Sequence, residues 1–395
     1  MKEIKRRNFL KLSGLSLLPA LLPPLAANAH TTAVKNETPA DPIISFTDDG
    51  VHYAPADYVA KLQEINQKDA IKADVYGQGG ALARLTKRFA EITGKGAATY
   101  MPTGTMANQL AISVLSGENT KIFVQDTSHI YRDEADAAQS VFNKRLMPLA
   151  PGAAYFTLED LKAGINFVNE GEVFKSGIGV VAIENPVRRC DGQQVPIEEI
   201  RKISAFCRSN GYKLHMDGAR IYLAAAVSGV SIAEYASNFD TVYISLYKYL
   251  GADGGAILCG DKAVIDKMEH LIKIHGGTVY SNWSKAAMAL YHLDGLEDRL
   301  KKTVVQATDL FEKLNKLPGI SINPIKNGSN IFDFKLTAAT DVKKFRQALY
   351  EKHKVMIRNA NHDGVIKLQI NETLLRADNQ SLVNAFTDAL ATAKV

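Results

Sequence analysis

The chain has 395 residues, of which 46% are hydrophobic and 23% charged, with 47 Lys and Arg against 42 Asp and Glu. That length suffices for two hydrophobic cores, and a net charge of only +5 excludes the strongly basic surface of a nucleic-acid-binding protein. The three cysteines, Cys190, Cys207 and Cys259, are widely separated and odd in number, so they indicate neither a disulfide framework nor a metal site.

Residues 1–29 have the pattern of an export signal. A basic stretch, KRRNFLK, precedes an apolar run over residues 12–25 and a small-residue cleavage site, ANA. The paired Arg6 and Arg7 are typical of twin-arginine signals, whose pathway exports folded proteins. A transmembrane anchor is the alternative, but the run is short for a span and contains three prolines. We predict a periplasmic or exported protein that uses the twin-arginine translocase and has no membrane segment after cleavage.

The mature chain is nearly neutral. Cleavage removes five basic residues and one acidic residue, which leaves 42 Lys and Arg against 41 Asp and Glu over about 366 residues (395 minus 29). We therefore expect no nucleic acid partner. The polar residues 30–45 that follow are predicted to form a loose leader.

A helix, a strand and a second helix are predicted next. From Leu82 the apolar side chains recur at helical spacing until the Gly-Lys-Gly of 94–96. The strand AATYM (97–101) then runs into PTGTMANQL. A strand that ends in a Gly-containing turn and opens a helix presents free N–H groups to an anion, although a plain capped helix is the alternative. We predict that this turn binds phosphate through Thr103, Gly104 and Thr105.

Strands and helices alternate through the middle of the chain. Strands are predicted at 121–126, 177–185 and 212–217, with a helix at 197–210 before the last of them. This interval argues for a mainly parallel sheet wrapped by helices, in which ligands bind beyond the carboxyl ends of the strands. His129 follows the first of these strands, where a lone histidine is most often a hydrogen-bonded loop residue.

Two residues that follow apolar strands make chemical sense together. Asp217 ends the strand YKLHMD, and Lys248 follows the strand TVYIS, 31 positions later. A pyridoxal phosphate enzyme needs a lysine to hold the cofactor aldehyde as a Schiff base and a carboxylate to keep the pyridine nitrogen protonated. Taken singly, the aspartate is usually a cap and the lysine a solvated side chain.

The sequence around this pair resembles the threonine aldolase and β-eliminating lyase family. HMDGAR (215–220) and SLYKYLG (245–251) match its HxDGAR and SxxKxLG motifs, and TGTMAN (103–108) matches its phosphate-binding SGTMAN with one conservative change. The resemblance implies an α/β protein of pyridoxal phosphate fold-type I, with a mainly parallel seven-stranded sheet in a large domain and a small C-terminal α/β domain.

The domain boundaries follow from the later elements. Helices are predicted at 263–274 and 283–293, and a long connecting helix at 296–317. Strands around ISINP, NIFDFKL and VIKLQIN alternate with helices at 342–353 and 380–393. We therefore predict a large cofactor-binding domain over 46–295 and a small domain over 296–395.

The resemblance also implies a role for each site residue. Lys248 would hold the cofactor, Asp217 would face its ring nitrogen, and His129 would stack on its ring and help to move a substrate proton. Arg220 would bind the substrate carboxylate, with Lys367 as a second contact. No metal is implied, and family members similar to this chain work as homodimers or homotetramers with residues from two chains around each cofactor.

The chain also departs from typical threonine aldolases. Tyr247 replaces a serine, the segment 275–283 lacks an arginine that usually holds the phosphate, and Lys367 stands where an arginine is expected. The segment ENPVRR keeps Glu184 and Asn185 but loses a following His-Asn pair. We interpret these changes as a divergent branch. The aromatic residues Tyr247, Tyr280 and Trp283 favour a substrate side chain that is larger or more apolar than methyl, unless they only pack the core.

The favoured function is cleavage of a β-hydroxy-α-amino acid to glycine and an aldehyde. A pyridoxal phosphate β-eliminating lyase or an amino-acid racemase is the alternative, since the bond that breaks depends on which one stands perpendicular to the ring. A third possibility, an exported cofactor- or amino-acid-binding protein without turnover, agrees with the missing phosphate arginine but not with the retention of both Lys248 and Asp217.

Overall fold

The computed structural model describes residues 42–394. The predictions for the export signal and for most of the leader fall on residues 1–41 and therefore lie outside the described residues. The described residues belong to one compact unit. Among them, no helix has both the length and the apolar character that crossing a bilayer requires.

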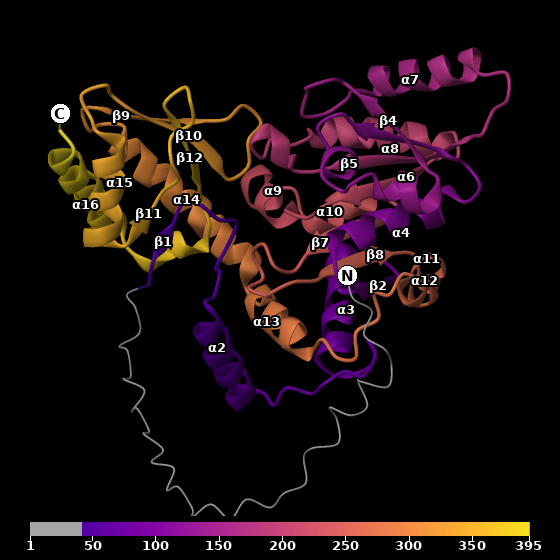
Figure 1. The fold of residues 1–395 in the computed structure, drawn as a ribbon, viewed down its shortest axis with the longest axis horizontal. Coiled ribbons are helices and arrows are strands. Elements are labelled where there is room, and N and C mark those ends of the chain that lie inside the picture. Colours follow the sequence, from indigo (N-terminus) through magenta and orange to yellow (C-terminus); the bar gives the residue numbers. More distant parts are fainter. Residues whose placement is uncertain (1–41, 395) are drawn as a thin grey trace, which may run out of the picture. The chain divides into compact units, whose positions relative to one another are not determined.

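A seven-stranded sheet organises the first two thirds of the described chain (Figure 1). Its strand order is β2-β8-β7-β6-β5-β3-β4, and only β8 runs antiparallel to its neighbours. The predicted mainly parallel α/β sheet is thus confirmed. The strands are β2 (Ala97–Met101), β3 (Lys121–Gln125), β4 (Arg145–Leu149), β5 (Ile178–Glu184), β6 (Lys213–Asp217), β7 (Thr241–Ser245) and β8 (Ala256–Gly260).

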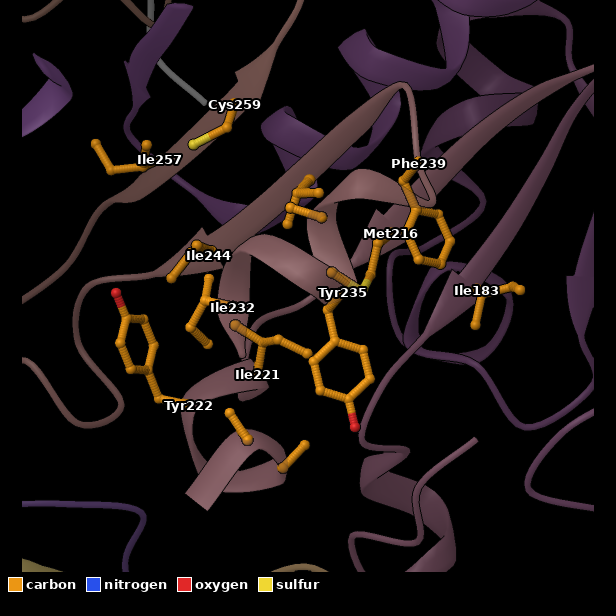
Figure 2. Packing of buried hydrophobic residues seen from close by; sticks show 14 of the residues in the cluster. Ile183, Met216, Ile221, Tyr222, Ile232, Tyr235, Phe239, Ile244, Ile257 and Cys259 are labelled. Carbon is orange, nitrogen blue, oxygen red and sulfur yellow. The ribbon is translucent and has the colours of Figure 1, made fainter. Parts of the chain in front are cut away.

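Both faces of this sheet are covered, which explains why a central strand such as β5 is apolar on both sides over Val180–Ile183. Along β5, Val181 and Ile183 belong to one core, whereas Val180 and Ala182 belong to another. Figure 2 shows the first of these cores, where Ile183 and other strand side chains lie near residues of two helices, such as Ile221. The helices that contribute to this core include α3 (Gly80–Thr93), α7 (Leu158–Gly171), α8 (Ile197–Ser209), α9 (Ile221–Ser228), α10 (Ile232–Ser237) and α13 (Trp283–Leu293).

The other face of the sheet is covered mainly by α4 (Gly104–Ser116), whose Leu110 and Ile112 are fully buried. Smaller helices pack beside it, namely α5 (His129–Arg132), α6 (Ala137–Phe142), α11 (Lys262–Ile265) and α12 (Met268–Ile274). Because α4 begins where β2 ends, its N-terminus lies at the same edge of the sheet as the carboxyl ends of the parallel strands.

A separate core holds the C-terminal part of the chain. It contains an antiparallel sheet of order β12-β10-β9. Its elements are α14 (Leu296–Leu314), β9 (Ile320–Pro324), β10 (Ile331–Leu336), α15 (Val342–His353), β11 (Val355–Met356), β12 (Val365–Gln369) and α16 (Asn379–Thr392). Ile44 and Phe46 also pack in this core, because β1 (Ile44–Ser45) pairs with β11. The prediction of a loose leader is therefore wrong at its end, because Ile44 and Ser45 form a strand that joins the C-terminal core. The boundary at 295/296 stays a prediction.

Three local differences from the predicted elements stand out. The predicted helix 263–274 is two short helices, α11 and α12. Lys262 at the start of α11 forms an ion pair at 2.7 Å with Asp266, which directly follows α11. The connecting helix α14 ends at Leu314 because the Asn315 side chain hydrogen-bonds both backbone groups of Ile322 on the next strand. Helix α2 (Pro55–Lys68) was not predicted, and none of its residues is buried.

Candidate active site

A cavity of about 290 Å³ opens at the carboxyl ends of β5, β6 and β7. A larger cavity of about 770 Å³, bordered by α2 and α13, holds none of the predicted site residues, so the chemistry of the lining rather than its size identifies the site. The smaller cavity is lined by Pro102, Thr103, Gly104, Thr105, His129, Glu134, Glu184, Asp217, Ala219, Arg220, Tyr243, Tyr247, Lys248, Asp253, Gly254 and Gly255.

The structure brings together all but one of the predicted site residues. Thr103, Gly104, Thr105, His129, Asp217, Arg220 and Lys248 all line the cavity. Lys367 does not, because its amine is bound by Asp191 at 2.7 Å and by Asp333 at 2.6 Å. The prediction that Lys367 makes a second contact with the substrate carboxylate is therefore corrected: Lys367 does not line the cavity, and two carboxylates already bind its amine.

The predicted phosphate turn is the capped start of α4. The Thr103 side chain accepts a hydrogen bond from the Met106 N–H at 3.1 Å, which leaves earlier N–H groups of the first turn for an anion. A Cβ atom at Gly104 would lie 2.1 Å from the Tyr243 hydroxyl oxygen, so any side chain there would collide with Tyr243. Glycine is required at this position because the helix start and Tyr243 approach so closely.

Asp217 is held by two hydrogen bonds in a nearly solvent-free position. Its Oδ2 accepts from the Asn108 side chain at 3.0 Å, and its Oδ1 accepts from the Ala219 N–H at 3.1 Å. The residue is 2% exposed. Hydrogen bonds to both oxygens fix the orientation of the carboxylate, which is the type of group that a pyridine nitrogen needs as its partner.

His129 lines the cavity with its ring tied to a buried carboxylate. Its Nδ1 lies 3.1 Å from Glu134 Oε1, and this hydrogen bond raises the pKa of His129 above its usual value. The His129 backbone N–H donates to Glu184 at 2.7 Å. Burial, with a further contribution from Asp217, raises the pKa of Glu184 to about 7. The cavity thus contains two groups, an imidazole and a carboxyl, that can exchange protons near neutral pH.

Lys248 is half-buried and lies over an aromatic ring. Its Nζ is 4.8 Å from the centre of the Tyr247 ring and 3.4 Å from the Tyr247 hydroxyl oxygen. The segment that carries the lysine is packed tightly from the N-terminal side: a Cβ at Gly50 would lie 2.6 Å from Tyr249 Cα and 2.9 Å from the Lys248 carbonyl oxygen. The backbone of Lys248 is therefore held by residues that are distant in sequence.

Arg220 makes an ion pair that the sequence did not predict. Its Nε donates to Asp49 Oδ2 at 2.7 Å, and Asp49 also accepts a hydrogen bond from Gln369 on β12. Arg358 in turn donates to Gln369 at 2.9 Å. Asp49 accepts a hydrogen bond only from the Nε of Arg220. The Nη atoms of Arg220 make no hydrogen bond to the part of the chain that the structure describes, so they are left to bind a carboxylate.

Several residues of the site were not assigned a role from the sequence. Glu134, which orients His129, and Asp49, which pairs with Arg220, had no local signal. Asn108 and His215 belong to two of the three recognised motifs, and the structure shows that they hydrogen-bond each other at 2.9 Å. The motifs could have marked them as site residues, but not which groups they contact.

The arrangement fits pyridoxal phosphate. The turn at Gly104 offers N–H groups for the phosphate, Lys248 offers an amine for the aldehyde, and Asp217 offers a carboxylate for the ring nitrogen. His129, Glu134 and Asp217 also have ligand atoms within 4.8 Å of one another, a spacing that would suit a metal ion. Asn108 donates to both of these carboxylates, which accounts for their closeness by hydrogen bonding.

Two proteins of known name are similar in sequence to more than half of this chain. A low-specificity L-threonine aldolase of Candida albicans is 36% identical over 222 residues, which are 56% of this chain and 59% of that protein. The alanine racemase TOXG of Cochliobolus carbonum is 30% identical over 255 residues, 63% of this chain and 64% of that protein. The aligned part thus spans less than two thirds of each of these relatives.

A solved structure shares the fold over most of the chain. It is a putative aromatic amino acid β-eliminating lyase/threonine aldolase from Exiguobacterium, 25% identical, with a TM-score of 0.73 over 88% of this chain and 96% of that one. The model of the beta-eliminating lyase family matches residues 59–337, well over half of the chain. This protein therefore belongs to the beta-eliminating lyase family.

Proposed function

We propose that this protein is a pyridoxal phosphate-dependent lyase that cleaves a β-hydroxy-α-amino acid into glycine and an aldehyde. The observation that carries this proposal is that Lys248 and Asp217 line one cavity together with the phosphate turn at Gly104. The name of the Candida albicans relative, a low-specificity L-threonine aldolase, supports the same reaction.

When bound, pyridoxal phosphate supplies an electron-accepting ring for the breaking of a bond at the substrate α-carbon. Asp217 would face the ring nitrogen of the bound cofactor and keep its proton in place. His129, whose Nδ1 proton is directed to Glu134, keeps Nε2 as the basic atom. Nε2 takes the proton of the β-hydroxyl group as the Cα–Cβ bond breaks and the aldehyde leaves. His129 would then return this proton to the α-carbon, which completes glycine and restores the neutral imidazole.

A panel of β-hydroxy and β-substituted amino acids tests this reaction. Wild-type protein is incubated with each compound and pyridoxal phosphate, and aldehyde, glycine, ammonia and keto acid are measured. Equal amounts of aldehyde and glycine support the proposal. Ammonia and keto acid without aldehyde would show β-elimination, and cofactor binding without any product would show a binding protein.

Racemisation is the second candidate function, and a specific observation favours it. The relative from Cochliobolus carbonum is an alanine racemase, and proton removal from the α-carbon needs the same cavity residues, Asp217 and Lys248. Chiral chromatography of L-alanine after incubation measures this activity. Formation of D-alanine faster than any aldehyde would replace the aldolase proposal by this one.

Arg220 is predicted to bind the substrate carboxylate, and its replacement tests this. We expect Arg220→Leu to raise KM about thirtyfold or more, because a charge-assisted bidentate contact contributes roughly 2 kcal/mol. Arg220→Lys should lie between this variant and wild type, since it keeps the charge but not the planar fork. Steady-state kinetics with the best substrate of the panel measure each effect.

Lys367→Met provides the matched comparison. Because Asp191 and Asp333 bind its amine, we expect its loss to change KM by no more than about threefold. Equal losses from Arg220→Leu and Lys367→Met would contradict this assignment and would mean that the cavity rearranges when substrate binds.

We propose that the chain represents a divergent branch of the threonine-aldolase-like proteins whose substrate side chain is larger or more apolar than methyl. Tyr247 lines the cavity and is 41% exposed, so it is available to such a side chain. Tyr280 and Trp283 do not line the cavity of the same chain and are themselves 65% and 37% exposed. Threonine as the best substrate of the panel would contradict this proposal.

We also propose that the protein acts as a homodimer or homotetramer. Tyr76 and Tyr280 are exposed aromatic residues whose rings lie 5.3 Å apart, and α2 buries none of its residues. Among the residues that the structure describes, Lys248 and the paired Arg220 are the only lysine and arginine that line the cavity, so a second copy would supply further charge for the phosphate. Sedimentation that shows a fully active monomer would contradict this.

We propose further that the protein is exported by the twin-arginine translocase to the periplasm. The paired arginines and the apolar run of residues 1–29 support this proposal. Replacement of Arg6 and Arg7 by lysine should retain the protein inside the cell. Unchanged export of that variant, measured by cell fractionation, would contradict the proposal.

A further inference from the structure

Asn108 lies at the centre of a buried chain of hydrogen bonds. Its amide nitrogen donates to Glu134 Oε1 at 2.8 Å and to Asp217 Oδ2 at 3.0 Å. Its amide oxygen is 2.9 Å from His215 Nε2, and His215 Nδ1 is 2.8 Å from Thr241 Oγ1. Asn108, His215 and Thr241 are fully buried and do not line the cavity. One amide therefore connects two carboxylates that do line it.

The neighbours determine which end of the Asn108 amide faces the carboxylates. Burial lowers the pKa of His215 to about 4, so its imidazole is neutral at physiological pH and carries a single ring proton. Ionised carboxylates only accept hydrogen bonds, so the amide nitrogen faces them and the amide oxygen faces His215. His215 then donates from Nε2 to Asn108 and accepts the Thr241 hydroxyl hydrogen at Nδ1.

The two carboxylates that Asn108 contacts have different tasks. Asp217 is the partner of the ring nitrogen, whereas Glu134 accepts the Nδ1 proton of His129 at 3.1 Å. Ligand atoms of these three residues lie within 4.8 Å of one another. Two negative charges this close in a buried site repel each other, which tends to push the two side chains apart. A donor to each carboxylate offsets that repulsion.

We propose that Asn108 is a positioning residue for the reaction: its two N–H groups hold Asp217 and Glu134 separate and correctly oriented. This inference rests on the proposed function and extends it to a residue that touches neither cofactor nor substrate. Asn108 lies one turn after Gly104 on α4. The same helix therefore presents N–H groups to the phosphate at its start and supports the ring-nitrogen partner one turn later.

The Asn108→Ala variant removes both donors. Titration of the apoprotein with pyridoxal phosphate should show an affinity about tenfold weaker than wild type. In the loaded enzyme, kcat should fall roughly a hundredfold with a smaller change in KM, because the bound substrate still meets Arg220. The acid limb of the pH profile of kcat/KM should move up by about one pH unit, because the uncompensated carboxylates raise the proton affinity of His129.

Thr241→Val is the matched control. It is nearly isosteric and equally buried, and it removes a hydrogen bond of the same chain without contacting either carboxylate. We expect a lower Tm, an affinity for pyridoxal phosphate within about twofold of wild type, and an unchanged acid limb.

Asn108→Asp keeps the inference testable if Asn108→Ala does not fold. The introduced carboxyl has the shape of the amide but donates a hydrogen bond only when it is protonated. We therefore expect its affinity for pyridoxal phosphate, relative to wild type, to improve as the pH is lowered from 8 to 6. A wild-type affinity for pyridoxal phosphate together with a wild-type acid limb in Asn108→Ala would overturn the inference. An affinity of Asn108→Asp that does not depend on pH would also overturn it. So would a shift of the acid limb in Thr241→Val as large as in Asn108→Ala. A wild-type protein that binds no pyridoxal phosphate would instead overturn the proposed function, and this inference with it.

Discussion

Replacement of Lys248 by alanine is expected to abolish covalent attachment of pyridoxal phosphate and to lower kcat/KM roughly a thousandfold or more. The reason is that Lys248 offers the cavity's amine to the cofactor aldehyde, where its Nζ lies over the Tyr247 ring. Borohydride reduction of the loaded wild-type protein, followed by peptide mapping, should place the reduced cofactor on the peptide that contains Lys248. The variant should carry none.

Lys285→Ala is the control for this prediction. Lys285 is a partly buried lysine whose Nζ lies 3.4 Å from Asp253, a residue that lines the same cavity, but Lys285 itself does not line it. The control should retain the covalent cofactor. Reduced cofactor on the peptide of Lys285, or on any peptide other than that of Lys248, would refute the central assignment.

The second large effect is expected from Asp217→Asn. This change keeps the size of the side chain but removes the negative charge that holds the proton on the ring nitrogen. The protein should still attach the cofactor through Lys248, because the amine and the phosphate turn are unchanged. Cleavage should fall by about a thousandfold, since an unprotonated ring accepts electrons poorly.

Asp253→Asn tests whether any carboxylate of the cavity would give the same result. Asp253 lines the cavity, but its side chain is 53% exposed. It forms an ion pair with Lys285 and accepts a hydrogen bond from the Tyr58 hydroxyl. We expect less than about a tenfold loss. Full activity of Asp217→Asn would mean that Asp217 only caps the turn through the Ala219 N–H.

Together the two variants separate attachment of the cofactor from its use. Lys248→Ala should lose both, whereas Asp217→Asn should keep attachment and lose cleavage. Asn108→Ala should resemble a weaker form of Asp217→Asn and, because Asn108 also donates to Glu134, should add a shift in the pH profile. A structural defect alone would not produce this order of effects.

The sequence by itself determined the parallel sheet and most of the cavity. The middle of β5, from Val180 to Ile183, is apolar at every position because both faces are covered, and this pattern is local. Asp217 ends β6, whereas Lys248 and Gly104 lie shortly after the ends of β7 and β2, and the carboxyl ends of parallel strands meet at one edge of a sheet. Three separate motifs could therefore be placed in one site before any contact was known.

Only the tertiary structure decided the contacts that join distant segments. Asp49 pairs with Arg220 across 171 positions, and two carboxylates neutralise Lys367, which the sequence had placed in the site. Asn108 reaches Asp217 across 109 positions. No local periodicity or motif spacing encodes such pairs, because they depend on how α4, the N-terminal segment and the C-terminal sheet pack. The residue types of the site follow from the sequence, whereas the charge that each one presents follows from its packing.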